Sequence, residues 1–193
     1  PGQFGAPAKV SITENNNKIN INVLSYDATG NLTSEVSQTM KKNLAEYLSN
    51  YRMINDYVVI GSAEVIDLAL DISVVLDATQ NQGVVISNIV DRVTTFFSPT
   101  VRGLGENIVL SELNRILQAE NGVLSVTDIS VFNKVGGQYS SAQTAMPYSD
   151  AATKKISLVD NTIFAEPNQI YQVHFPTKDI TVRVKNYQTT NFS

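Results

Sequence analysis

The sequence predicts an α+β protein, in which a mixed β-sheet is packed with helices in the order β-α-β-α-α-β and a β-rich C-terminal extension follows. Two patterns carry this prediction: segments in which apolar and polar residues alternate, and segments in which apolar residues recur every three or four positions. Because helices alternate with strands, we expect the helices to cover the sheet. The chain has 193 residues, 42% of them apolar, and is long enough to bury a core.

The chain is expected to open with an arm or linker over residues 1–18. Two prolines and two glycines stand among the first ten residues, and asparagines occupy positions 15–17. Ile19, Ile21 and Val23 then alternate with asparagines, which is typical of a half-buried strand. The core is therefore expected to begin at about residue 19.

A helix is expected after the turn at residues 27–31. Thr33 or Ser34 can cap it, because a hydroxyl at this position accepts a hydrogen bond from the first helical amides. The apolar residues of this segment form one helical stripe: Val36, Met40, Leu44, Tyr47, Leu48 and Tyr51. The stripe predicts that the helix packs on the sheet through one face.

The clearest strand follows at residues 66–77. Its apolar residues occupy every second position: Ile66, Leu68, Leu70, Ile72, Val74 and Leu76. Asp67, Asp71 and Asp77 occupy positions of the opposite parity. We therefore expect one buried face and one solvated face that carries three carboxylates.

Two further helices are expected next. The first covers residues 81–97, and Pro99 follows its end. The second is short and follows the glycine loop at residues 102–107. Ser111 is its expected cap, and Gly122 is expected to stop it with a left-handed conformation.

The rest of the chain is expected to be β-rich, with one irregular segment. Residues 123–132 predict a strand. Residues 134–155 are mostly small and polar, and an irregular segment of this length is typical of a functional or disordered loop. Three short strands are expected after it, at 156–158, 170–175 and 180–184.

These patterns divide the chain into three expected parts. They are an arm or linker at 1–18, an α/β core at 19–133, and an irregular loop with a β-rich extension at 134–193. The sequence starts with Pro1 instead of methionine, so we expect it to be a piece of a longer protein.

Composition and charge exclude several classes of partner. The net charge is −4 and the lysines and arginines are scattered, whereas nucleic-acid binding needs a concentrated basic surface. No apolar run approaches the roughly 20 residues that span a membrane. Cysteine is absent, which removes disulfides and thiolate chemistry. We therefore expect neither nucleic acid nor a membrane as partner, and the many neutral polar residues favour assembly with other proteins.

The sequence predicts no catalytic, cofactor-binding or metal-binding residue, and hence no enzyme. His174 is the only histidine, and because no motif pairs it with a nucleophile we expect it at the surface or in an interface. Asp67 and Asp71 would lie about 13 Å apart along a strand, too far to share a metal ion. The loop at 102–107 lacks the third glycine of a dinucleotide-binding fingerprint, so a tight turn is favoured.

Three large side chains stand isolated in the small, polar segment after residue 134. Tyr139, Met146 and Tyr148 are our candidate anchors of a protein–protein interface, because a few large side chains usually carry most of the binding energy of an interface and these three are isolated in an otherwise small, polar segment. The alternative is that they fix the segment to its own domain.

Between residues 60 and 131 the elements follow a specific order. An alternating strand and a helix lead to a glycine turn, which continues through I-x-L-S-x-L into a short helix before a Gly-Val pair opens the next strand. The residues that carry this order are Gly103, Ile108, Leu110, Ser111, Leu113, Gly122 and Val123. Together with the strand and helix upstream, the order covers about residues 19–131 and resembles the baseplate J-like family of contractile-tailed phages. The β-rich extension makes the chain most similar to the C-terminal part of T4-type baseplate wedge proteins.

The resemblance implies a structural role in a bacteriophage tail. Members of the family pair and link wedges into the ring around the tail hub. We therefore expect a homodimer that contacts other baseplate wedge proteins, resides in the tail baseplate of the virion and is assembled in the host bacterial cytoplasm. A carbohydrate- or small-ligand-binding module of a phage tail stays open as the alternative, and it would require a concave pocket with converging polar groups.

Overall fold

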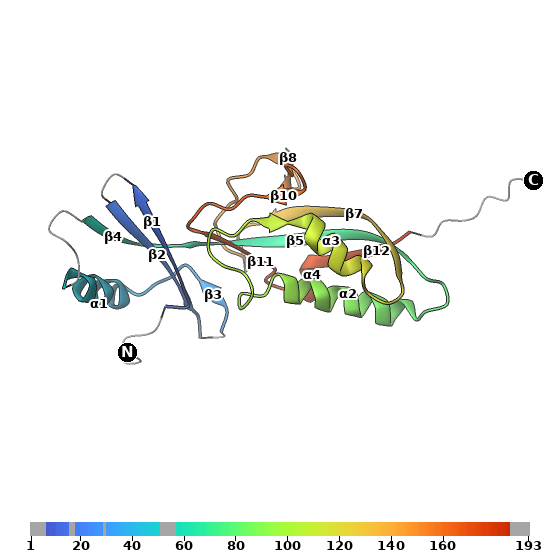
Figure 1. Cartoon of the computed structure of the whole chain (residues 1–193), viewed down its shortest axis with the longest axis horizontal. Helices are drawn as coiled ribbons and strands as arrows, with labels where there is room; N and C mark the ends of the chain where they lie inside the picture. The colour runs from blue at the N-terminus through green and yellow to red at the C-terminus, as the bar shows by residue number, and fades with distance from the viewer. Residues whose placement is uncertain (1–6, 16–17, 29, 51–56, 186–193) are drawn as a thin grey trace, which may run out of the picture.

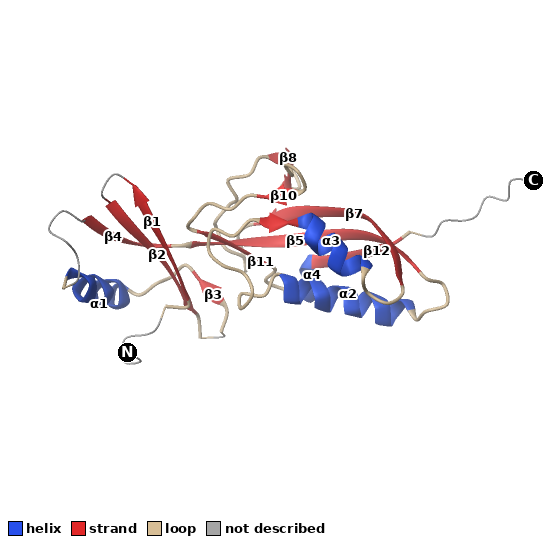
Figure 2. Cartoon of the chain, viewed as in Figure 1, coloured by secondary structure: helices blue, strands red, loops and turns tan. Residues whose placement is uncertain are grey.

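The computed structural model describes residues 7–15, 18–28, 30–50 and 57–185 (Figure 1). The molecule is elongated. A sheet with one helix lies at the N-terminal end, and a larger sheet with the other helices forms the rest (Figures 1 and 2). This arrangement confirms the α+β class. No helix in the described part of the chain is long and apolar enough to cross a membrane.

The N-terminal sheet has β2 at its centre. Its strands are β1 (Lys9–Asn15), β2 (Lys18–Tyr26), β3 (Leu32–Thr33) and β4 (Tyr57–Ser62). β1 pairs antiparallel with one edge of β2 and β4 pairs parallel with the other, while β3 pairs with the last residues of β2. The expected arm is therefore wrong for residues 9–15. In this segment Val10 and Ile12 alternate with polar residues, and they pair with Val23 and Ile21.

The first helix, α1 (Gln38–Ser49), begins later than expected. Ser37 caps it, with its hydroxyl accepting a hydrogen bond from the amide of Met40 at 3.2 Å. The expected caps Thr33 and Ser34 are wrong, because β3 takes Thr33 into the sheet and the helix cannot begin there.

The apolar stripe of α1 faces the N-terminal sheet but is only half-buried. The helix contributes Met40, Leu44 and Leu48, which pack beside the buried Ile21, Val23 and Val36. Tyr47 was expected on this stripe, but it is 60% exposed. Tyr51 lies outside the described residues. The N-terminal sheet and α1 therefore enclose a small hydrophobic cluster.

The central sheet is built around the long strand β5. Its strands are β5 (Glu64–Leu76), β7 (Val123–Lys134), β8 (Tyr148–Asp150), β9 (Lys155–Ile156), β11 (Gln169–Gln172) and β12 (Ile180–Val184). β7 pairs antiparallel with one edge of β5, and β11 and β12 pair parallel with successive halves of the other edge. The extension after residue 133 thus supplies two strands beside the centre of the core, so the expected boundary divides segments that fold together.

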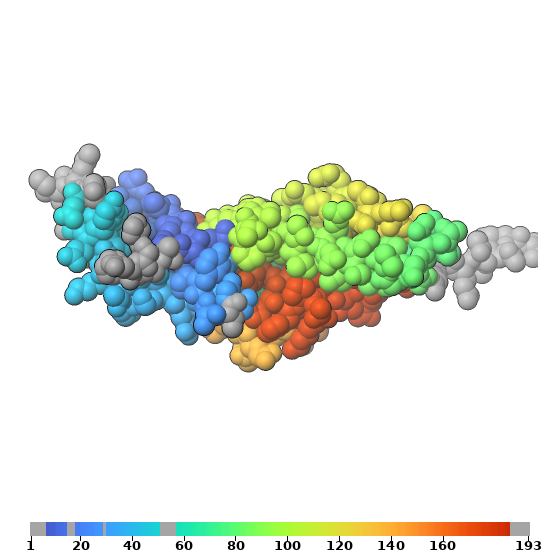
Figure 3. Space-filling model, turned by 90° about the horizontal axis from the view of Figure 1, so that it is seen from below, coloured from blue at the N-terminus to red at the C-terminus, as the bar shows by residue number. Residues whose placement is uncertain are grey.

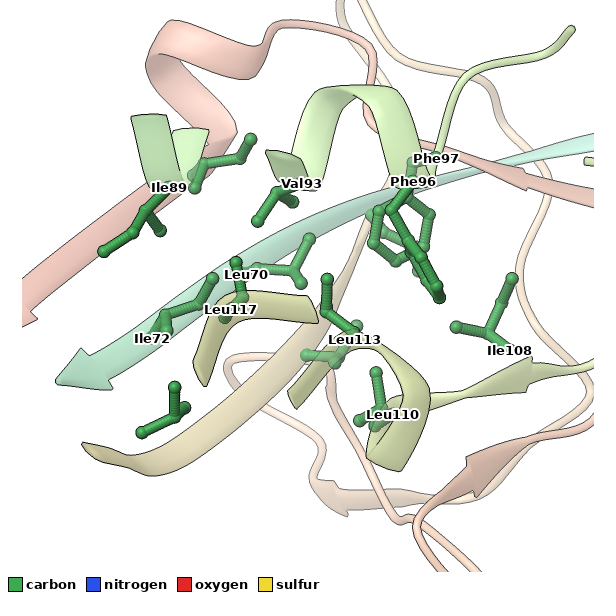
Figure 4. Packing of buried hydrophobic residues seen from close by; sticks show 14 of the residues in the cluster. Leu70, Ile72, Ile89, Val93, Phe96, Phe97, Ile108, Leu110, Leu113 and Leu117 are labelled. Atoms are coloured by element: carbon green, nitrogen blue, oxygen red, sulfur yellow. The ribbon is translucent and has the colours of Figure 1, made fainter. Parts of the chain in front are cut away.

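Helices cover one face of the central sheet. They are α2 (Gln82–Phe96), α3 (Leu110–Gln118) and the short α4 (Pro176–Asp179) between β11 and β12. Ile89 and Val93 of α2 and Leu113 of α3 point toward Leu70 and Ile72 of β5 (Figure 4). This is the main hydrophobic core of the described residues.

The ends of α2 and α3 have different causes. Asn81 caps α2 by accepting hydrogen bonds from the amides of Gly83 and Val84, so the helix expected at 81–97 is confirmed. The cap expected at Ser111 is wrong, because α3 begins at Leu110. It begins there because it directly follows β6 (Ile108–Val109), which pairs with β10 (Thr162–Ile163).

Ala63 alone separates β4 from β5, so one extended backbone runs through both sheets. The amide of Ala63 donates to the carbonyl of Val23 at 3.0 Å, and the amide of Glu64 donates to the carbonyl of Asn168 at 2.7 Å. The chain therefore changes its partner strand at this residue. A small buried cluster joins the two sheets here: Leu24, Leu32, Ala63, Val65 and Ile170. The N-terminal part consequently sits at one end of the long body (Figure 3).

Gly122 forms the turn before β7 and is expected to resist substitution. Its φ is +90°, and an added Cβ would lie 2.7 Å from Cγ2 of Val85 in α2. We expect Gly122→Ala to lower the free energy of unfolding by about 2 kcal/mol, because a left-handed backbone and an overpacked contact add. Gly136→Ala is the matched control, since its φ is +81° but nothing lies within 4 Å of the added Cβ. Urea denaturation measures both, and equal losses would contradict the packing argument.

Candidate functional site

The segment between β7 and β8, residues 135–147, lies against the central sheet and is fixed there by buried polar groups. Asn133, at the end of β7, accepts hydrogen bonds through Oδ1 from the amide of Thr144 at 3.0 Å and from the hydroxyl of Tyr148 at 2.8 Å. The hydroxyl of Thr144 lies 2.7 Å from that of Tyr171 in β11. The segment is therefore ordered by side chains from two strands on opposite sides of β5. We call these contacts around Asn133 and Thr144 the first of three polar anchors of the segment.

Asp67 of β5 is the centre of a second anchor. Its side chain is buried, with the residue only 1% exposed. Oδ2 accepts a hydrogen bond from the amide of Ser140 at 2.7 Å, and Oδ1 accepts one from Nε2 of Gln172 at 2.8 Å. Nδ1 of His174 lies 3.9 Å from Oδ1. A carboxylate that accepts two hydrogen bonds can be buried without a full ion pair.

The expected solvated face of β5 is therefore wrong at Asp67, because the segment 135–147 and β11 cover it. The other two aspartates are half-buried. Asp71 pairs with Arg183 of β12, with Nη2 and Oδ2 2.7 Å apart, and this pairing raises the pKa of the arginine. Asp77 accepts a hydrogen bond from the amide of Thr79 at 2.9 Å, which lowers the pKa of its carboxyl group.

Tyr139 forms the third anchor. Its hydroxyl donates to Oδ1 of Asp179 at 2.6 Å, and Asp179 itself is only 2% exposed. Burial of the phenol, together with the hydrogen bond to Asp179, raises the pKa of Tyr139 to about 12. The ring also stacks edge-to-face on Phe175, and Nζ of Lys178 lies 5.4 Å from its centroid.

A polar cavity of about 470 Å³ opens beside these anchors. Asp67, Tyr139 and His174 line one side, and residues 33–35 of the N-terminal part line another. Carboxylates, hydroxyls and a single imidazole can exchange hydrogen bonds with a polar molecule. No group of acidic and histidine side chains in the described ranges is suited to hold a metal ion.

The candidate interface residues all make contacts within the chain. Tyr139 and Tyr148 donate the hydrogen bonds described above, and Met146 packs half-buried against the main core. These contacts agree with the alternative that the three residues fix the segment to its own domain, and their role in an interface stays a prediction. His174, expected at the surface or in an interface, keeps 18% of its side chain exposed and stacks on Phe175.

Sequence reasoning missed the buried polar partners of the segment. Asn133 directly follows Phe132 at the end of a predicted strand, and Thr144 stands between Gln143 and Ala145. Neither residue type indicates by itself that the side chain is buried.

Asp179 carried one usable signal in the sequence, because Pro176 is typical of the first position of a helix and an acidic residue is favoured in the first turn. In the structure, Oδ2 of Asp179 accepts a hydrogen bond from the amide of Phe175 at 2.9 Å.

The raised pKa of Tyr139 predicts a loss of stability at alkaline pH. In the unfolded chain the phenol loses its proton near pH 10, whereas in the folded protein it keeps the proton to about pH 12. The folded state therefore binds more protons between these values, and stability falls as the pH rises through that window.

Tyr139→Phe tests this linkage. The substitution removes one hydrogen bond to a buried carboxylate, so we expect it to lower the free energy of unfolding by about 1.5 kcal/mol at neutral pH. It should also flatten the alkaline decline measured by urea denaturation across a pH series. Tyr57→Phe, at a tyrosine that is 62% exposed, controls for the loss of a hydroxyl. An alkaline decline identical in Tyr139→Phe and the unmutated chain would refute the assignment.

Comparison with known proteins shows a similarity to a solved structure. No protein-family model matches the sequence, and no curated protein matches it. Among solved structures, the chain is similar to a chain in the cryo-EM structure of the anti-feeding prophage (AFP) baseplate, six-fold symmetrised. The TM-score is 0.55 and the identity 11%, over 86% of this chain and 33% of that chain. The two share a fold, and this chain spans about one third of the length of the chain it matches.

Proposed function

We propose that the protein is a structural component of a contractile-tail baseplate. The observation that carries the proposal is the shared fold with a chain of the anti-feeding prophage baseplate, which extends over 86% of this chain. It includes elements of both sheets, so the similarity is not limited to one common supersecondary motif. The buried polar anchors found above act on the protein's own segment, which suits a structural role better than a catalytic one.

The finer proposal is a wedge protein of the baseplate J-like type that resides in the virion tail. In this proposal two copies pair, contact other wedge proteins and help to close the ring around the hub, after assembly in the host cytoplasm. Support comes from the order of elements at residues 60–131 and from the exposed apolar side chains of the N-terminal sheet. Ile12 in β1 is 67% exposed.

The location can be tested directly. An epitope tag is fused to the protein in the organism that makes it, and contractile-tail particles are purified by density gradient. We expect the tag to sediment with the particles and immunogold particles to lie at the baseplate end of the tail. Tag that stays in the soluble fraction while intact particles form would overturn the proposal.

A second candidate is favoured by the polar cavity. The volume of the cavity lies within the range of small-molecule sites, and its polar lining supports a carbohydrate- or small-ligand-binding module. Saturation-transfer NMR of the chain with neutral mono- and disaccharides tests this candidate. Signal that is lost in Gln172→Ala would support it, and absence of transfer for every sugar would remove it.

A further inference from the structure

The outer edge of β1 is an open strand edge. β1 lies at the end of its sheet, and no strand in the described ranges pairs with its second edge. It has seven residues, without proline or a bulge, and Val10 and Ile12 are 44% and 67% exposed. Natural proteins usually protect such an edge, because its free amides and carbonyls can pair with another chain.

The apolar side chains of β1 lie on the face that α1 covers only in part. Val10 and Ile12 pair with Val23 and Ile21, and directly paired residues point to the same face of a sheet. Val23 and Ile21 belong to the cluster beneath α1. The exposed residues of β1 therefore extend this buried cluster toward the open edge.

We propose that a second copy of the chain pairs antiparallel with β1, so that the two N-terminal sheets become one continuous sheet. The proposal rests on the self-association proposed above and names its surface. A two-fold pairing needs a strand that is complementary to itself. Lys9 near the start of β1 and Glu14 near its end lie at positions of opposite parity, so they point to opposite faces of the sheet. An antiparallel pairing about the middle of the strand sets neither charge opposite a like charge, whereas a parallel pairing in register sets Lys9 opposite Lys9 and Glu14 opposite Glu14.

The side chains also specify a register. When Ser11 lies opposite Ser11 of the second copy, each Val10 lies opposite Ile12 of the other copy, and apolar residues pair on the α1 face. A shift by two residues, with Ile12 at the centre, would set Val10 opposite Glu14. The hydroxyl of Ser11 is shielded from solvent and makes no hydrogen bond to the described residues. Rotation toward its counterpart would give it a partner.

The pairing is expected to be weak in isolation. A strand of seven residues is about 23 Å long. The contact area along a single strand edge of this length is smaller than that of a standard interface, which buries about 800 Å² on each partner. A dimer that forms at high concentration and dissociates on dilution is the expected behaviour, and repeated copies in a ring would strengthen it by avidity.

The first test is the solution mass of the 193-residue chain over a concentration series, by analytical ultracentrifugation. We expect the mass to rise from 21.1 kDa toward twice that value. Ile12→Lys should raise the dimer dissociation constant at least about tenfold. Leu124→Lys is the matched control, because Leu124 is equally exposed but lies at the start of β7. Circular dichroism checks that both variants keep the fold.

A second test does not depend on weakening the edge. The chain has no cysteine, so Ser11→Cys introduces a single thiol at the proposed two-fold axis. Directly opposite residues in antiparallel strands are close enough for a disulfide. We expect Ser11→Cys to form a covalent dimer under mild oxidation and Leu124→Cys to form little.

The outcomes separate the surface from the function. A dimer that persists in Ile12→Lys, without cross-linking at Ser11→Cys, overturns the β1 pairing and leaves self-association standing. A chain that stays monomeric at every concentration overturns the pairing with a second copy and leaves the tag-localisation test of the baseplate role untouched.

Discussion

Asp67→Ala is expected to destabilise the protein by about 3 kcal/mol, one of the two largest effects that we anticipate. The substitution removes the acceptor for the amide of Ser140 and for Nε2 of Gln172, and of these two hydrogen bonds the one from Gln172 is buried and the one from Ser140 is partly buried. A buried donor without an acceptor loses its hydration and gains nothing in return. Asp67→Asn should rescue little, because one of the two donors would then face an amide NH₂ group.

Asp71→Ala is the matched control, because Asp71 has the same side chain and lies on the same strand. Its partner Arg183 has a side chain that is 66% exposed, and an exposed ion pair contributes about 0–1 kcal/mol. Urea denaturation gives the two losses. Hydrogen exchange of the Ser140 amide adds a local readout and should accelerate in Asp67→Ala. Equal losses in the two variants would show that Asp67 does not anchor the segment 135–147.

The long elements of the fold could be predicted because their periodicity is local. β5 and α2 each repeat an apolar pattern over more than ten residues, and the structure confirms both. β1 could not be recognised, because two prolines and two glycines precede it and its alternation covers only Val10 to Glu14. Its pairing with β2 supplies the stability that its own sequence does not show.

The site was harder to predict than the fold because its contacts join distant residues. The alternation in β5 correctly places Asp67 on the face opposite the apolar residues. It also predicts that Asp67 is exposed to solvent, and this is wrong. The partner that covers Asp67 from β11 is Gln172, 105 residues later, and no pattern within β5 contains that information. The isolated aromatic residues did indicate the segment 135–147, since Tyr139 and Tyr148 form hydrogen bonds that fix it to the sheet.

Leu113→Ala is expected to lower the free energy of unfolding by about 3 kcal/mol. Leu113 in α3 is fully buried between the helices and β5, so truncation loses apolar burial and leaves a cavity (Figure 4). Leu48→Ala is the matched comparison in α1. It removes the same atoms, but Leu48 is half-buried and α1 holds no fully buried residue. We expect its loss to be about 1 kcal/mol.

The contrast between these two leucines tests how the N-terminal part is stabilised. Its cluster has three buried residues, against the much larger core under α2 and α3, so α1 should exchange its amide protons faster than α2. If β1 pairs with a second copy, the protection of the β1 and β2 amide protons from hydrogen exchange should rise with protein concentration, while the protection of the α2 amide protons stays constant. A loss in Leu48→Ala as large as that in Leu113→Ala would instead mean that the two sheets unfold as one unit through the cluster around Ala63.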